Sequence, residues 1–317
     1  MLSYYVCKAG SFNRYYFSVV LVLLCFFSAR TQDAVSVLKA TFDAERMVGT
    51  DYPATAEQSF NFTRNLIFFP ARINGRMGNF VLDTGAPALL INNRGEDLQS
   101  QPAPTGLAAG GSVALTNQMV ESFEMGGRNL GKRWALALDL RSMEERTGQT
   151  IDGFVGHELL NNKEVRINFP DRRFQLRKSV RQPLYKGQEP RKVLRFDFVD
   201  HLPVITVKVG KRKLRFAIDT GAGVNIIDED NAALCQAVGE QMNIQGLDGK
   251  STLNEVVTIP GLRIVDAEEE KETSFVSMDL AHLQSPSGAP ISGIIGSAFL
   301  RNYVVSIDYR RRKLYFW

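Results

Sequence analysis

Residues 80–86 read FVLDTGA, and residues 216–222 read FAIDTGA. In each stretch three apolar residues deliver an aspartate, Asp83 or Asp219, into a turn that begins Asp-Thr-Gly. A single Asp-Thr-Gly turn would carry little information, because Asp and Gly are common turn residues. Here both turns follow a segment with the character of a buried strand, where an ionisable side chain is costly to place. The recurrence therefore indicates a repeated unit that positions two carboxyl groups.

The match extends well beyond the two turns. Residues 60–62 (FNF) correspond to residues 196–198 (FDF) at the same offset of 136 positions (219 minus 83). Three later matches keep an offset of 140 (296 minus 156), which implies about four extra residues in the middle of the second copy. These matches are 138–140 with 278–280, 151–156 with 291–296, and 167–169 with 307–309.

The repeat predicts the domain organisation. We expect two lobes, at residues 60–178 and 196–317, joined by a linker at residues 179–195 that is polar over most of its length. Residues 1–31 are interpreted as a signal peptide. Residues 32–59 have no counterpart in the second copy, and they could form a pro-segment, an extra strand or a disordered lead.

The periodicity inside each copy is that of strands, and long amphipathic helices are scarce. We expect a hairpin in each copy, with turns at Asn74-Gly75 and at Gly210, and a short helix after each second glycine motif, at residues 157–161 and 297–302. The predicted fold class is mostly β, with each lobe a closed or nearly closed sheet.

The N-terminal apolar run covers residues 15–29, which is shorter than the roughly 20 residues that a membrane-spanning helix needs. Arg30 and a polar segment follow it. A signal peptide cleaved near Gln32 is the preferred interpretation, so the chain would be periplasmic or extracellular. An uncleaved membrane anchor and a lipidated Cys25 are the alternatives.

Composition excludes several classes of function. The chain has 317 residues, of which 44% are apolar and 23% charged, as in globular proteins, and its net charge of +4 is spread along the sequence. We therefore expect no nucleic-acid partner. Cys235 alone would remain in the exported chain, as a buried small hydrophobe. The three histidines lie far apart with no ligand spacing, so we expect no metal and assign His157 a capping or surface role.

Two carboxyl groups held close together cannot both ionise easily, so one keeps a proton while the other is charged. Such a pair can hold a water molecule, deprotonate it for attack on a peptide carbonyl, and protonate the leaving nitrogen. Asp139 and Asp279 also recur at equivalent positions. We expect these two to accept hydrogen bonds from the local backbone at strand ends.

On these motifs the chain resembles the aspartic peptidases of the pepsin and retropepsin type. Each Asp-Thr-Gly-Ala turn is followed by a run of aliphatic residues, at 89–91 and 226–227, and later by an apolar-apolar-Gly motif that ends at Gly156 or Gly296. The resemblance covers nearly everything after Ser59. It implies a bilobal fold with a pseudo-twofold axis, and an endopeptidase that acts on a polypeptide substrate without a cofactor. The site residues that it implies are Asp83 and Asp219 as catalytic groups, with Thr84, Gly85, Thr220 and Gly221 as supporting loop residues.

The resemblance also implies a mobile hairpin over each catalytic turn, at residues 106–113 and 246–251, with glycines at the tips. The candidate flap residues are Gly106, Gly110, Gly111, Gly246 and Gly249. The flap tyrosine of pepsins is missing, and Pro87 stands where pepsins usually have serine. With two copies in one chain, a monomer could form the whole site. A dimer, and a non-catalytic peptide-binding or scaffold protein of the same fold, remain open as alternatives.

Overall fold

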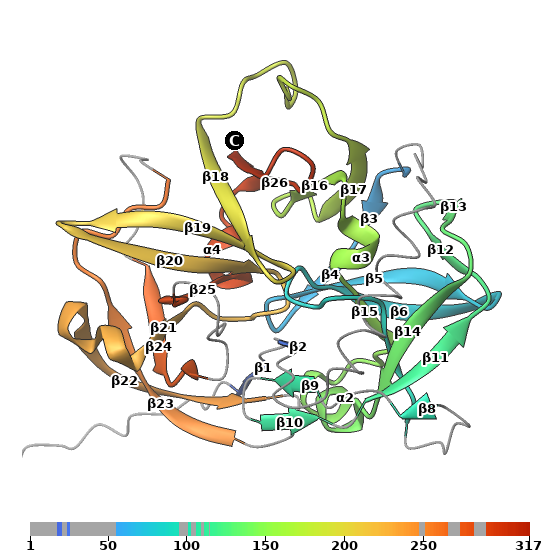
Figure 1. The fold of residues 1–317 in the computed structure, drawn as a ribbon, viewed down its shortest axis with the longest axis horizontal. Helices are drawn as coiled ribbons and strands as arrows, with labels where there is room; N and C mark the ends of the chain where they lie inside the picture. The colour runs from blue at the N-terminus through green and yellow to red at the C-terminus, as the bar shows by residue number, and fades with distance from the viewer. Residues whose placement is uncertain are drawn as a thin grey trace, which may run out of the picture.

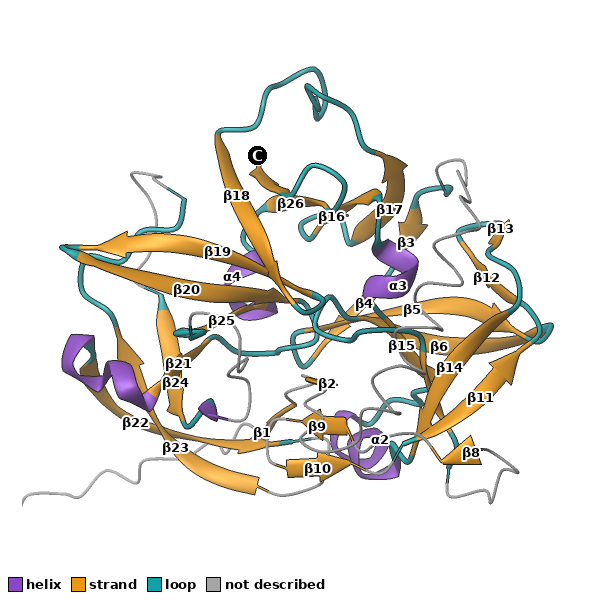
Figure 2. Ribbon diagram, in the orientation of Figure 1, coloured by secondary structure: helices purple, strands orange, loops and turns teal. Residues whose placement is uncertain are grey.

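The computed structural model describes residues 18–20, 24–25, 55–94, 101–102, 106–108, 111–113, 115–246, 251–265, 273–281 and 290–317. These residues form a mostly β protein in which the longest helix is α2, Arg141–Thr147 (Figure 2). The predicted fold class is confirmed at this level. None of the helices within these ranges is long and apolar enough to cross a membrane.

The first copy of the repeat forms a ten-stranded sheet (Figure 1, blue to green). Its strands lie in the order β13-β12-β5-β6-β15-β7-β14-β11-β8, and β4 pairs with β5. Their bounds are β4 Asn61–Thr63, β5 Leu66–Ile73, β6 Arg76–Leu82, β7 Leu90–Asn92, β8 Gln101–Pro102, β11 Thr116–Val120, β12 Phe123–Met125, β13 Arg128–Asn129, β14 Arg133–Leu138 and β15 Gly153–Val155.

The second copy belongs to a fourteen-stranded sheet in the order β1-β22-β23-β24-β21-β25-β20-β19-β18-β27-β26-β16-β17-β3. A small third sheet contains β10, β9 and β2. The bounds are β1 Ser18–Val20, β2 Leu24–Cys25, β3 Gln58–Ser59, β9 Gly106–Ala108, β10 Gly111–Val113, β16 Lys163–Asn168, β17 Arg173–Lys178, β18 Lys192–Val199, β19 Leu202–Val209, β20 Arg212–Asp219, β21 Ile226–Asp228, β22 Gln236–Gln245, β23 Ser251–Thr258, β24 Ser274–Met278, β25 Gly293–Gly296, β26 Val304–Asp308 and β27 Lys313–Phe316.

The sequence repeat is also a repeat of strand pairing. In the first copy β15 lies parallel to β6 and antiparallel to β7, while β7 lies parallel to β14. In the second copy β25 has the same relation to β20 and β21, and β21 lies parallel to β24. In Figure 1 the first group lies on the right and the second on the left.

The strands at the C-terminal end of each copy depart from the expectation of one closed sheet per copy. Strand β16 of the first copy pairs antiparallel with β26 of the second, so both copies contribute to one sheet. These strands lie above and between the two groups in Figure 1. The register places Arg166 opposite Ser306, which is its own counterpart in the repeat (306 minus 166 is 140).

The predicted turns and short helices are present. Asn74 and Gly75 join β5 to β6 with φ of 48° and 77°, the positive values that a tight hairpin turn needs, and Gly210 joins β19 to β20 with φ of 58°. Helices α3 (His157–Leu160) and α4 (Ser297–Leu300) follow β15 and β25. A 3-10 helix, η1 (Glu229–Leu234), leads into Cys235, which is only partly buried and packs against the core.

Strands β1 and β2 lie within the segment predicted to be a signal peptide; β1 pairs in parallel with β22, and β2 pairs with β9. The rest of residues 1–31, and residues 32–54, lie outside the described residues. Export of the chain, and its alternative of a membrane anchor, therefore stay predictions.

A buried ionic network holds β16 against β26. Glu164 has no exposed surface, and its Oε1 accepts hydrogen bonds from Arg166 Nη2 at 2.7 Å and from Ser306 Oγ at 2.9 Å. The Arg166 guanidinium also lies 4.7 Å from the ring centre of Trp317. A buried charge that loses its partner typically destabilises a protein by about 3 to 5 kcal/mol.

We therefore expect Glu164→Leu to lower the free energy of unfolding by about 3 kcal/mol, because it leaves the Arg166 guanidinium buried without its carboxylate. Urea denaturation followed by circular dichroism measures this change. The matched control is Glu121→Gln, which removes the exposed ion pair with Lys132 and should cost less than about 1 kcal/mol. Equal stability of the two variants would contradict the prediction.

Candidate active site

The two aspartates of the repeat lie at the ends of equivalent strands. Asp83 directly follows β6, and Asp219 is the last residue of β20. Strand β6 lies parallel to β15 and strand β20 lies parallel to β25, and β15 and β25 contain the apolar residues of the two apolar-apolar-Gly motifs. Both aspartates have no exposed surface. Two buried carboxyl groups are costly unless hydrogen bonds and protonation compensate for their burial.

Gly156 and Gly296 explain why the later motifs end in glycine. A Cβ built on Gly156 would lie 2.4 Å from the carbonyl oxygen of Ala86, and one on Gly296 would lie 2.2 Å from that of Val224. Both distances are far below van der Waals contact. The strands therefore pass directly against the backbone of the Asp-Thr-Gly turns, and only glycine fits at these two positions.

Thr84 and Thr220 tie the two turns together reciprocally. The Thr84 backbone N–H donates to Thr220 Oγ1 at 3.1 Å, and the Thr220 N–H donates to Thr84 Oγ1 at 3.0 Å. Each hydroxyl in turn donates to a carbonyl of the opposite copy, Ile218 at 2.9 Å and Leu82 at 2.8 Å. All four groups are buried, so this network fixes one turn relative to the other.

Each carboxyl group is held by its own turn and lies against the glycine of the other turn. Asp83 Oδ1 accepts from the Gly85 N–H at 2.8 Å, and Asp219 Oδ1 accepts from the Gly221 N–H at 2.8 Å. A Cβ built on Gly85 would lie 2.5 Å from Asp219 Cγ, and one on Gly221 would lie 2.4 Å from Asp83 Cγ. The structure thus brings together all six residues that the sequence assigned to the candidate site.

The environment favours protonation of both carboxyl groups. Burial raises the pKa of Asp83 well above its usual range. The charge of Asp219 and a hydrogen bond to Asp219 raise the pKa of Asp83 further. Burial raises the pKa of Asp219 to about 7, although backbone N–H groups lower it in part. Among the described residues, no N–H or O–H group donates to the Oδ2 atom of either aspartate. Since ionised carboxylates are acceptors only, a hydrogen bond between the two requires one shared proton.

The candidate flaps correspond to two hairpin regions. Gly106 and Gly111 lie in β9 and β10, which pair antiparallel, and Gly246 directly follows β22 at the tip of the β22–β23 hairpin. Gly110 and Gly249 lie outside the described residues. Asp83 and Asp219 have no exposed surface, so a substrate could reach them only after the segments that cover them had moved. The assignment of these hairpins as flaps stays a prediction.

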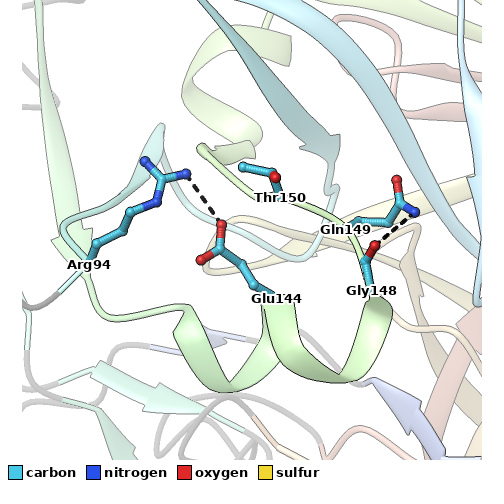
Figure 3. A pocket seen from close by; sticks show the side chains of 5 residues that line it. All are labelled: Arg94, Glu144, Gly148, Gln149 and Thr150. Carbon is cyan, nitrogen blue, oxygen red and sulfur yellow. Dashed lines mark hydrogen bonds and ion pairs between the residues drawn. The ribbon is translucent and has the colours of Figure 1, made fainter.

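A shallow hollow elsewhere on the chain does not include the aspartates. It has a volume of about 420 Å³ and is lined by Arg94, Glu144, Gly148, Gln149 and Thr150 (Figure 3). The Arg94 guanidinium in it is already paired, with Glu144 at 3.2 Å and with Asp152 at 3.0 Å. These ion pairs connect the middle of α2, through Glu144, to Arg94 and Asp152, so the guanidinium in the hollow already has two carboxylate partners.

The other recurring aspartates act locally, as expected. Asp139 Oδ1 accepts from the Arg141 N–H at 3.0 Å, and Asp279 Oδ1 accepts from the Ala281 N–H at 2.7 Å. Within the part of the chain that the structure describes, no group of three or more His, Cys, Asp or Glu side chains is arranged to hold a metal ion.

Two histidines lie beside the site, which the sequence did not suggest. His201 Nε2 is 2.7 Å from the carbonyl oxygen of Gly85, and the His157 ring centre lies 6.4 Å from that of His201. Burial lowers the pKa of His201 to about 4 and that of His157 to about 3, so both rings are neutral at pH 7. The capping role expected for His157 is wrong, because Gly156 is the N-cap of α3 and no side chain caps that helix; the His157 ring is half-buried and packs against Phe198 and Tyr309. The counterpart of His201 is Asn65 (201 minus 65 is 136), and this shared offset was the available signal.

No protein-family model matches the chain, and no curated protein matches it.

Proposed function

We propose that the chain is an exported aspartic endopeptidase that hydrolyses peptide bonds with a water molecule activated between Asp83 and Asp219. The observation that carries this proposal is that two buried carboxyl groups on equivalent turns each lie against the glycine of the opposite turn, and that the turns are bonded to each other through Thr84 and Thr220. Both carboxyl groups come from one chain, so the proposed site is complete without a second copy.

The finer fold that we propose is bilobal with a pseudo-twofold axis. Support comes from two places where a residue meets its own counterpart in the repeat. Thr84 and Thr220 exchange hydrogen bonds, and Arg166 lies opposite Ser306 in the β16–β26 pairing. Residues that lie on a twofold axis meet their own counterparts, so these two contacts support the proposed axis.

The proposed reaction needs only the two carboxyl groups and water. The ionised member of the pair removes a proton from the water molecule, and the water oxygen attacks the peptide carbonyl carbon. The protonated member donates its proton toward the carbonyl oxygen, and the tetrahedral intermediate collapses as the C–N bond breaks and the amine gains a proton. Backbone N–H groups of Gly85 and Gly221 hold the carboxyl groups in place throughout.

Mass spectrometry of a diverse peptide pool, incubated with the purified chain from pH 3 to pH 9, tests the proposal directly. We expect internal cleavage of extended peptides, with one solvent oxygen incorporated into each new carboxyl group. If no peptide is cleaved at any pH but peptides bind the chain, the function is binding and the endopeptidase proposal is wrong.

We expect cleavage to be faster at pH 7 than at pH 5. Below both pKa values the pair holds two protons and has no base, and one proton must leave before the water can be activated. Because burial raises the pKa of Asp219 to about 7, this loss occurs near neutral pH, and kcat/KM should rise by up to about tenfold per unit below it. An activity maximum below pH 5 in the pH profile of kcat/KM would contradict the prediction.

A further inference from the structure

One hydrogen bond joins the candidate site to a turn in the other copy of the repeat. His201 lies between β18 and β19, and its Nε2 is 2.7 Å from the carbonyl oxygen of Gly85. A carbonyl oxygen can only accept, so the neutral ring carries its proton on Nε2 and donates it. A side chain of the second copy thus holds the catalytic turn of the first copy.

The peptide group that His201 holds lies against both carboxyl groups. The Gly85 N–H donates to Asp83 Oδ1 at 2.8 Å, and a hydrogen bond from the same N–H lowers the pKa of Asp219. A Cβ on Gly85 would lie 2.5 Å from Asp219 Cγ, so the backbone there touches that carboxyl group. A displacement of Gly85 would therefore change the contacts of both aspartates at once.

A related contact runs in the opposite direction, to a carbonyl group two residues beyond Gly221, which is the counterpart of Gly85. Asn65, the counterpart of His201, lies in the turn between β4 and β5, and its Nδ2 donates to the carbonyl oxygen of Gly223 at 2.8 Å. Gly223 lies four residues after Asp219, in the second catalytic turn. Two counterpart side chains therefore each reach across to the turn of the other copy.

An aromatic cluster of His157, Phe198 and Tyr309 lies beside His201, whose ring centre is 6.4 Å from that of His157. The His157 ring lies 5.3 Å from the ring of Phe198 and 5.3 Å from that of Tyr309. Burial raises the pKa of the Tyr309 hydroxyl well above its usual value, and the negative charges of Asp83 and Asp219 raise it further. The His201 ring therefore lies at the edge of this cluster, next to His157, while its Nε2 donates to the Gly85 carbonyl oxygen.

We propose that His201 and Asn65 are positioning residues, which set the relative placement of Asp83 and Asp219 by holding the catalytic turn of the opposite copy. The inference rests on the proposed function, because placement affects a rate only if the pair does chemistry. A misplacement of about 1 Å can cost about 100-fold in rate. Neither side chain is part of the proposed reaction, so the loss falls on kcat rather than on KM.

His201→Phe removes the donor and keeps an aromatic ring, and it should lower kcat about 10- to 100-fold with KM within about twofold of the parent. His201→Gln restores an N–H donor and should recover most of kcat. The matched control is His157→Phe, which changes a ring of the same cluster that donates to neither catalytic turn, and it should keep kcat within about twofold. A folded His201→Phe variant with the parent's kcat would overturn the proposal.

A second readout does not depend on activity. Carbon-13 NMR of labelled aspartates follows the titration of the Asp83–Asp219 pair, and in His201→Phe the pair should titrate at higher pH, because a displaced Gly85 N–H stabilises the ionised form less. If the titration shifts but the parent cleaves no peptide, the positioning role stands and the endopeptidase proposal fails. If the parent cleaves peptides and neither kcat nor the titration responds, the positioning role fails. Asn65→Leu makes the same test from the other turn if His201→Phe does not fold.

Discussion

Asp219→Asn is expected to lower kcat for peptide cleavage by at least about 10⁴-fold, with little change in KM. An amide can neither remove a proton from water nor share one with Asp83, although its size and shape fit the same space. Asp83→Asn should have the same effect, and the double variant should be no slower than either single variant, because the pair acts as one unit. Initial rates on one cleaved peptide, measured at the optimum pH, test all three.

The matched control is Asp279→Asn, which makes the same substitution at an exposed carboxyl group of the same copy. The new side-chain oxygen can still accept from the Ala281 N–H, so cleavage should stay within about twofold of the parent. If the double aspartate variant retained the parent's rate, the proposed mechanism would be wrong.

Stability provides an independent check that the Asn variants are folded. The folded-state pKa of Asp219 is raised to about 7, whereas in the unfolded chain it is near 3.8. The protonated Asp219 side chain therefore makes its full contribution to the free energy of unfolding below about pH 3.8, and this contribution is lost as the pH rises through 7. Relative to the parent, Asp219→Asn should gain more stability at pH 8 than at pH 4, in thermal melts at both pH values.

The repeat made much of this architecture predictable. The constant offset of 136 predicted that Asp83 and Asp219 lie on equivalent strands. Strand-like segments separated by turn residues predicted the hairpins at Asn74 and Gly210, because a tight hairpin turn needs residues that adopt a positive φ. The proximity of the two turns followed from the expected symmetry. Helix α2 went unpredicted, although Gly148 ends it with a φ of 65°, since seven residues carry little periodic signal.

Features that break the repeat could not be predicted in the same way. His157, His201 and Tyr309 correspond to Ser297, Asn65 and Phe169, so no residue type recurs at these positions, although the offset of 136 pairs His201 with Asn65. Their rings come together only through packing between the copies. The shared sheet through β16 and β26 was missed for a similar reason, because pairing between copies leaves no mark in either copy alone.

Gly85→Ala and Gly221→Ala should each lower kcat by at least about 100-fold while leaving both carboxyl groups chemically intact. The added methyl group would lie 2.5 Å from Asp219 Cγ in the first variant and 2.4 Å from Asp83 Cγ in the second. Real carbon contacts are much longer, so the turn or the opposite carboxyl group must move. Overpacking of this kind also costs about 1 to 3 kcal/mol of stability, measurable by urea denaturation.

Gly210→Ala separates this steric effect from the general cost of replacing a glycine. Gly210 has a φ of 58° and nothing within 4 Å of a built Cβ, so the substitution strains the hairpin turn by about 1 kcal/mol without touching the site. Its kcat should match that of the parent. Gly85→Ala with the parent's kcat would contradict the close contact between the copies. Since each glycine touches the carboxyl group of the other copy, equal losses from the two variants would mean that placement of the pair depends on both turns.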